Sequence, residues 1–161
     1  MSPDGFSPRA SAPGAPHASG ELMTSDERLV RQFPVVRQYM TPAPHTIGPT
    51  SSLAAARRVM LQNHVRHLPV LDGGRVVGQL SERDLFLVES LPNVNPTDVR
   101  VEEAMVQSVF TVGPDTPVGE VVETMIERKL GSAVVCQDEH VVGVFTTIDA
   151  LQALHEALER P

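Results

Sequence analysis

The alternation of apolar and polar positions over residues 53–80 predicts a helix followed by two strands. Apolar side chains recur at helical spacing over residues 53–61, which is typical of an amphipathic helix. Two short apolar runs come next, at residues 68–71 and 76–80, and each has the length of a strand. The Asp-Gly-Gly sequence at residues 72–74 lies between them and is a turn signal. The pattern therefore predicts a helix and a β-hairpin.

The flanking residues extend this pattern into a unit with the order β-α-β-β-α. Residues 46–47 form a short extended piece ahead of a Gly-Pro turn. A serine at residue 51 or 52 is a good N-cap for the first helix, and a second helix opens at Ser81. Residues 86–100 contain two prolines and are expected to connect this unit to the second half of the chain.

The unit occurs twice, at an offset of 65 residues, as from Met40 to Met105. The alignment needs no gap. The other identical pairs are Val36 with Val101, Thr46 with Thr111, Gly48-Pro49 with Gly113-Pro114, Met60 with Met125, Val70 with Val135, Val76-Val77-Gly78 with Val141-Val142-Gly143, and Asp84 with Asp149. One unit cannot cover both faces of its small sheet, so the two repeats should pack together about a pseudo-two-fold axis. The predicted fold class is α+β.

Composition places most of the chain among globular proteins. The chain has 161 residues, of which 41% are apolar, and this suits two small halves that share a core. Residues 1–27 are rich in Pro, Ala, Ser and Gly and are expected to be disordered, whereas repeat 1 should occupy residues 33–90 and repeat 2 residues 98–158.

No membrane segment or secretory signal is apparent. The single cysteine, Cys136, is interpreted as a small buried hydrophobe and is compatible with a reducing, cytoplasmic location. The net charge of −7 argues against general nucleic-acid binding, which needs a basic face.

Both repeats carry the motif Gly-x-x-Ser/Thr-x-x-Asp where the second hairpin strand meets the next helix, at residues 78–84 and 143–149. The glycine would let a ligand or another backbone come close to the strand. The hydroxyl would lie at a helix N-cap, where free N–H groups favour an anion, and the carboxylate could accept hydrogen bonds from the hydroxyls of a ribose. A capping box that binds no ligand would have the same Ser/Thr-x-x-Asp sequence, so a purely structural role is the alternative interpretation. The motif's occurrence twice in one register favours ligand binding.

The chain resembles a tandem pair of CBS (cystathionine-β-synthase-type) domains, or Bateman module, over roughly residues 33–155. The matching features are Tyr-Met-Thr-Pro at residues 39–42, His-Val-Arg-His-Leu-Pro-Val at residues 64–70, and the two motifs above. The resemblance implies a cleft between the repeats with two sites for adenosyl ligands such as AMP, ADP, ATP or S-adenosylmethionine. The second repeat departs from the pattern, since Ala-Val-Val at residues 133–135 replaces Leu-Pro-Val.

Carried over from the family, the hydroxyl and the carboxylate of each motif would hold phosphate and ribose. The adenine would lie against the residues that follow the first helix, and the residue just before that helix would add a polar contact. The first site is expected to comprise Ser51, Val65, Arg66, His67, Ser81, Arg83 and Asp84. The second is expected to comprise Thr116, Leu130, Gly131, Ser132, Thr146 and Asp149.

The two sites are expected to differ in charge. Arg66, His67 and Arg83 surround the first motif, and arginine supplies charge-assisted hydrogen bonds to phosphate. The residues 65 positions further on are Gly131, Ser132 and Ile148. We therefore expect the first site to bind a phosphorylated ligand more tightly.

No feature of the sequence indicates an enzyme. There is no Gly-x-Ser-x-Gly elbow and no Gly-x-x-x-x-Gly-Lys-Ser/Thr loop. His45, His64 and His67 lack carboxylate or thiolate partners at a spacing that suits a metal site. The predicted function is a regulatory module that requires no cofactor, senses an adenosyl nucleotide and signals to a separate effector protein. The alternative is a ligand-free oligomerisation or interaction module.

Apolar residues on the second helix of each repeat predict a homodimer. Residues 85–88 and 150–158 would otherwise leave an apolar patch in water. The low basic content of the last helix argues against membrane binding.

Overall fold

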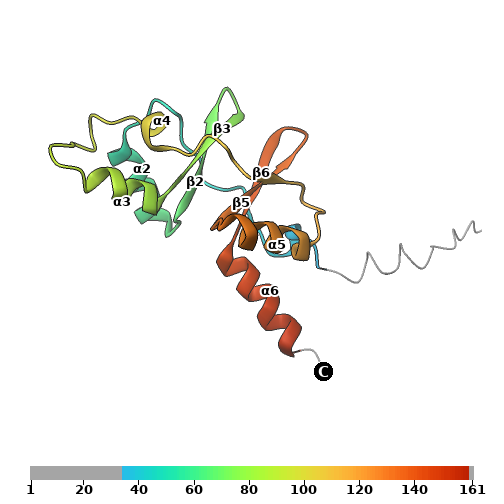
Figure 1. The fold of residues 1–161 in the computed structure, drawn as a ribbon. Coiled ribbons are helices and arrows are strands. Elements are labelled where there is room, and N and C mark those ends of the chain that lie inside the picture. Colours follow the sequence, from blue (N-terminus) through green and yellow to red (C-terminus); the bar gives the residue numbers. More distant parts are fainter. Residues whose placement is uncertain (1–33, 160–161) are drawn as a thin grey trace, which may run out of the picture.

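The first repeat forms the helix and the hairpin that its pattern predicts. The computed structural model describes residues 34–159. Helix α2 spans Leu53–Asn63, strands β2 and β3 span His67–Asp72 and Arg75–Ser81, and helix α3 spans Glu82–Glu89 (Figure 1). Ser52 caps α2, because its Oγ accepts a hydrogen bond from the backbone N–H of Ala55 at 3.1 Å.

The second repeat has the same order of elements. Helix α5 spans Val118–Arg128, strands β5 and β6 span Ser132–Gln137 and His140–Thr146, and helix α6 spans Thr147–Glu159. The extended piece before the first helix is strand β4, Thr111–Val112, which pairs in parallel with β5. In the first repeat, Ile47 forms the corresponding parallel bridge with Val70. The predicted duplication and the α+β class are confirmed.

Each repeat also opens on one short helical turn that the pattern did not predict. The 3-10 helix η1 spans Val36–Gln38, and helix α4 spans Val101–Ala104. Helix α3 continues to Glu89, so the connection between the repeats begins later than residue 86. The extension has a simple cause, since the first proline that can end the helix is Pro92.

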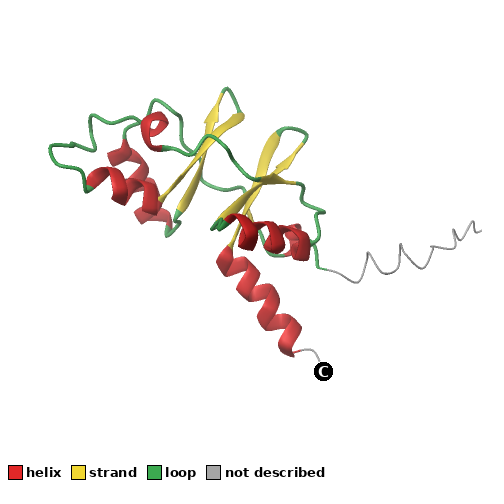
Figure 2. Ribbon diagram, viewed as in Figure 1, coloured by secondary structure: helices red, strands yellow, loops and turns green. Residues whose placement is uncertain are grey.

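The opening segments of the two repeats are exchanged. Strand β1, Thr41–Pro42, pairs antiparallel with β6, with Thr41 opposite Val144. In the other direction, Val106 bridges Gln79 of β3 through two backbone hydrogen bonds of 2.9 Å. Figure 2 shows the two hairpins side by side, each with its own pair of helices. Each repeat therefore completes the sheet of the other.

Two methionines from the exchanged segments explain the strand glycines. A Cβ atom on Gly78 would lie 2.3 Å from the Sδ of Met105, and a Cβ atom on Gly143 would lie 2.4 Å from the Sδ of Met40. Neither approach leaves room for a side chain. The glycine of each motif thus admits a methionine of the opposite repeat, where the sequence had suggested a ligand or another backbone.

The exchange also mixes the two hydrophobic cores. The first core gathers Leu53, Leu68, Leu80 and Leu85 from repeat 1, and Val101, which opens repeat 2, is fully buried in it. The second core gathers its own repeat's residues in the same way: Val118, Val121, Met125, Ala133, Val135, Phe145 and Ala153. Val36, which opens repeat 1, is fully buried there. Neither core is complete without the other repeat.

The predicted N-terminal tail, residues 1–27, lies outside the described residues. Cys136 is half-buried rather than part of the core, and burial raises the pKa of its thiol. Within residues 34–159, no helix has the length and apolar character that crossing a membrane requires.

Candidate functional site

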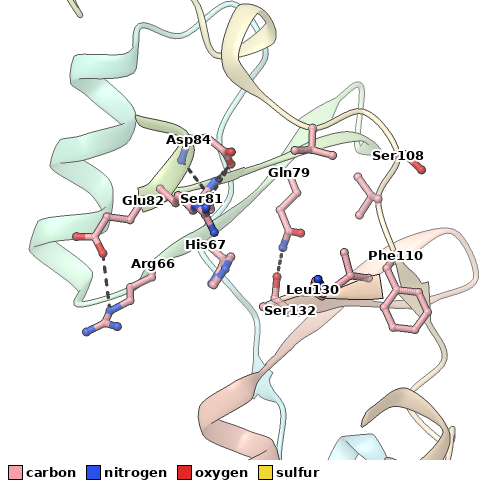
Figure 3. A pocket seen from close by; sticks show the side chains of 15 residues that line it. Arg66, His67, Gln79, Ser81, Glu82, Asp84, Ser108, Phe110, Leu130 and Ser132 are labelled. Atoms are coloured by element: carbon pink, nitrogen blue, oxygen red, sulfur yellow. Dashed lines mark hydrogen bonds and ion pairs between the residues drawn. The ribbon is translucent and has the colours of Figure 1, made fainter. Parts of the chain in front are cut away.

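A pocket of about 560 Å³ lies between the two repeats and is lined by both (Figure 3). We call it the cross-repeat pocket. The first repeat contributes Arg66, His67, Gln79 and residues 81–84, and the second contributes Val106, residues 108–110 and residues 129–132. Its volume falls within the range of small-molecule sites, about 300–1,000 Å³.

The Ser-x-x-Asp motif of the first repeat lies on the wall of this pocket and caps helix α3. Asp84 Oδ2 accepts hydrogen bonds from the backbone N–H of Ser81 at 2.8 Å and from the Ser81 hydroxyl at 2.5 Å. The Ser81 hydroxyl accepts in turn from the backbone N–H of Asp84 at 3.2 Å. The capping box is therefore present. It occupies Oδ2, so Oδ1 of Asp84 remains able to accept hydrogen bonds from a ligand.

The carboxylate of the second motif is held in the same way at the start of helix α6. Asp149 Oδ2 accepts from the backbone N–H of Thr146 at 2.7 Å and from the Thr146 hydroxyl at 3.0 Å. The two carboxylates are thus held alike, and a difference between the two sites must come from the residues around them.

The cross-repeat pocket concentrates positive charge in an acidic chain. Arg66, Arg83 and Lys129 line it, against two carboxylates, Glu82 and Asp84, while the whole chain has a net charge of −7. The Arg66 side chain is 80% exposed and lies 3.8 Å from Glu82, so this ion pair is loose and contributes little stability. An exposed guanidinium of this kind is free to turn toward an anion.

His67 lies where the two repeats meet. Its Nε2 would be 3.3 Å from a Cβ atom on Gly131. The pKa of His67 is lowered, chiefly because burial disfavours the charged ring; Arg66 lowers it further, whereas Asp84 and Glu82 act against the shift. The imidazole is therefore neutral at neutral pH.

A hydrogen bond joins the repeats along the floor of the pocket. Gln79 Nε2 donates to Ser132 Oγ at 2.8 Å, and Ser132 is the buried polar residue of the described chain, at 5% exposure. The same glutamine holds Val106 through its backbone. Gln79 thus fixes the segment that follows the exchanged Met105 against the strand that leads into Ser81.

The structure groups the expected site residues differently from the sequence. Residues 130–132, expected beside Thr146 and Asp149, line the cross-repeat pocket together with Ser81 and Asp84. Of the residues expected in the first site, Arg66, His67 and Arg83 also line it.

The remaining expected residues lie elsewhere. Val65 lines a separate groove of about 230 Å³ beside helices α2 and α3. The Ser51 hydroxyl lies against Gly48, and the Thr116 hydroxyl against Gly113, in the turns before the first helices.

Sequence reasoning missed seven residues of the pocket: Gln79, Glu82, Val106, Ser108, Val109, Phe110 and Lys129. Most follow Met105, in the segment that the exchange brings across. The only trace of the exchange in the sequence is that each repeat has a methionine before its first helix and a glycine in its closing strand.

A family model for the CBS domain matches residues 36–90 and 101–156. Among solved structures, the chain is similar to a putative acetoin utilization protein (AcuB) from Vibrio cholerae, with 27% identity, a TM-score of 0.69 and coverage of 79% of this chain and 94% of that one. It also shares its fold with the CBS domain pair of protein MJ0100 in complex with 5′-methylthioadenosine and S-adenosyl-L-methionine (24%, TM-score 0.71, 78% and 98% covered). A third similar structure is CBSX2 in complex with AMP (23%, TM-score 0.69, 78% and 99% covered).

The first curated relatives that the chain matches are longer proteins, of which it spans between 15% and 36%. They include A-adding tRNA nucleotidyltransferases and an inosine-5′-monophosphate dehydrogenase. The family model covers two segments that share one architecture and enclose the cross-repeat pocket. The chain therefore belongs to the CBS domain family and carries a tandem CBS pair.

Proposed function

We propose that this CBS pair is a regulatory module that binds a phosphorylated adenosine nucleotide in the cross-repeat pocket and transmits its occupancy to a partner protein. The observation that carries the proposal is the convergence of the Ser81–Asp84 motif with basic side chains and an apolar wall from the opposite repeat. The single cysteine is compatible with a cytoplasmic setting. No catalytic role is proposed.

Each part of an adenosine nucleotide has a complementary surface in the pocket. Val109, Phe110 and Leu130 offer apolar area for the flat base. The free Oδ1 of Asp84 suits the hydroxyls of the ribose. Arg66 and Lys129 approach from different repeats and suit the phosphates.

The known ligands of similar proteins support the same class of compound. MJ0100 was solved with S-adenosyl-L-methionine and 5′-methylthioadenosine, and CBSX2 with AMP, so all three ligands contain an adenosyl group. The excess of basic groups in the cross-repeat pocket favours the phosphorylated member. S-adenosylmethionine carries a positive sulfonium, which these groups would repel.

The second motif is proposed to be a weaker site. Ile148 takes the place of Arg83 within the second motif, so the helix turn that carries Asp149 lacks this arginine. Phosphate binding would lose the charge-assisted hydrogen bonds that an arginine supplies at this position.

The test compares Asp84→Ala with Asp149→Ala by titration calorimetry against AMP, ADP and ATP. The two variants are matched, because each removes a carboxylate that accepts from the backbone N–H and the hydroxyl of its own motif. Loss of hydrogen bonds to a charged group costs about 1.5–3 kcal/mol, so Asp84→Ala should weaken binding about 10- to 100-fold. Asp149→Ala should leave the tightest binding event nearly unchanged.

Two outcomes contradict the proposal in different ways. Loss of binding in Asp149→Ala alone would assign the tighter site to the second motif. No binding of any adenosyl compound to the wild-type protein would favour the alternative, a ligand-free interaction module whose motifs are only helix caps. A thermal-shift panel reports this quickly, since a ligand at 100 times its Kd adds about 2.7 kcal/mol of stability.

The alternative has an observation of its own, and both functions are compatible with a homodimer. Leu151, Leu154 and Leu158 lie exposed along helix α6, and Phe86 and Leu87 lie exposed on helix α3. We infer that these faces are covered by a second copy of the chain.

A further inference from the structure

The imidazole of His67 is placed to contact both repeats and a ligand at once. It stands at the start of strand β2, and its Nε2 faces the backbone at Gly131. Figure 3 shows the ring between Arg66 and the segment of Leu130 and Ser132. No other residue among 34–159 forms a hydrogen bond with its ring nitrogens. The ring therefore has hydrogen-bonding capacity that the protein does not use.

Charged groups lie on both repeats around this ring. Arg66 comes just before it in the chain, Glu82 and Asp84 lie on helix α3, and Arg83 and Lys129 line the same pocket. Burial dominates this environment and lowers the pKa of His67 in the ligand-free protein. A phosphate group would change the balance, because it brings a charge of about −1.5 to −2 and offsets the neighbouring cations.

We propose that His67 makes the cross-repeat pocket selective for phosphorylated ligands in a proton-dependent manner: the imidazole takes up one proton as the phosphate binds, and acid therefore strengthens the binding of AMP relative to adenosine. The proposal rests on the function proposed above and adds a specificity-determining residue to it. The protonated ring gains a second N–H donor for the phosphate and a positive charge beside it. Adenosine supplies no such anion and leaves the ring neutral.

Titration calorimetry with AMP and adenosine at pH 7.5 and pH 6.0 tests this inference. Uptake of one full proton strengthens binding tenfold per pH unit. Because uptake is partial over this interval, AMP affinity should rise about 3- to 10-fold on acidification relative to His67→Gln, which removes the titrating group. Calorimetry in two buffers of different ionisation enthalpy should show proton uptake with AMP in the wild-type protein and less in His67→Gln. His155→Gln, on the exposed face of α6, is the matched control and should behave as the wild type.

A second measurement needs no variant. The ring proton of His67, assigned in the full-length protein by NMR, should titrate at a higher pH with AMP than without it. An unchanged or lower midpoint would overturn the inference, as would equal pH dependence in wild type and His67→Gln. Binding of AMP without these effects leaves the proposed function intact. Absence of AMP and adenosine binding at both pH values would overturn the function and the inference together.

Discussion

At the scale of single residues, the two methionine–glycine contacts hold the repeats together. Met105 lies on Gly78 and Met40 lies on Gly143, and each contact joins one repeat to the other. These pairs occupy the strand just before each Ser/Thr-x-x-Asp motif. The position of the candidate ligand groups therefore depends on packing between the repeats.

We expect Gly78→Ala to destabilise the protein by about 1–3 kcal/mol, the usual cost of overpacking. The added Cβ would meet both the Sδ and the Cγ of Met105, at 2.3 and 2.9 Å, so the methionine must move. Urea unfolding measures the change. Gly119→Ala in helix α5 is the control, because nothing lies within 4 Å of its Cβ position and alanine favours the helix. Equal stability of Gly78→Ala and wild type would show that the contact is not tight.

His67 should also make the stability of the ligand-free protein depend on pH. Its folded pKa lies below the ordinary value of 6.5, so the unfolded chain binds the proton more readily. The free energy of unfolding should therefore be fully maintained above about pH 6.5 and should fall as the pH is lowered toward 5.5. Chemical denaturation across this interval checks the slope. His67→Gln should flatten it, and a slope that is unchanged in this variant would contradict the assignment.

At the scale of elements, the sequence predicted the first long helix and the hairpin of each repeat, but not the exchange of their opening segments. Apolar spacing, the Asp-Gly-Gly turn and the serine N-cap specify α2 and the hairpin, and the 65-residue offset transfers them to the second copy. The pairing of β1 with β6 of the other repeat has no comparable signal in the sequence. Pairing of Thr41 with its own repeat or with β6 would require the same alternation of side chains, so periodicity cannot distinguish them.

The same ambiguity limited the prediction of the site. The motif residues Ser81 and Asp84 were identifiable because a hydroxyl and a carboxylate at this spacing have a local geometry. Val106 and residues 108–110 were not, since they reach the pocket only through the bridge between Val106 and Gln79. Site residues that belong to one helix end can be predicted from the local sequence. Pocket residues that the other repeat contributes cannot, because their position depends on how the repeats pack.

The exchanged elements predict that one repeat does not fold alone as a monomer. A fragment of residues 34–95 lacks Met105 and Val101, and so loses a fully buried residue of its core. A chain of this length is also marginal on size alone. Light scattering identifies the monomeric fragment, and circular dichroism should show no cooperative unfolding transition for it. A monomer that unfolds cooperatively near the midpoint of the whole chain would contradict this expectation.

At the scale of the whole molecule, the two helix pairs offer unequal faces. In repeat 1, Arg57 forms an ion pair with Glu89 between α2 and α3, with Nε to Oε1 at 2.8 Å. In repeat 2, Val122 and Leu154 stand at the same two positions. The groove between α5 and α6 is correspondingly apolar, with a volume of about 380 Å³. The exposed groove between α5 and α6 of repeat 2 is therefore more apolar than the corresponding surface between α2 and α3 of repeat 1.

We expect Leu151→Glu combined with Leu154→Glu to convert a homodimer into a monomer. Both leucines are more than half exposed, at 58% and 53%, and charges there would repel in a symmetric interface. Light scattering at micromolar concentration measures the mass. Leu91→Glu is the control, because Leu91 is similarly exposed in the connection between the repeats. A monomeric wild-type protein, with and without nucleotide, would exclude the dimer.

The exchange of opening segments has a consequence for the ancestry of the chain. Each repeat holds both a methionine before its first helix and a glycine in its closing strand, so two copies of a single repeat could satisfy both contacts reciprocally. This is the arrangement of a symmetric dimer whose arms are swapped. A gene duplication would then have needed to add only the peptide connection at residues 90–100, after which the residues that line the cross-repeat pocket could diverge in charge between the two halves.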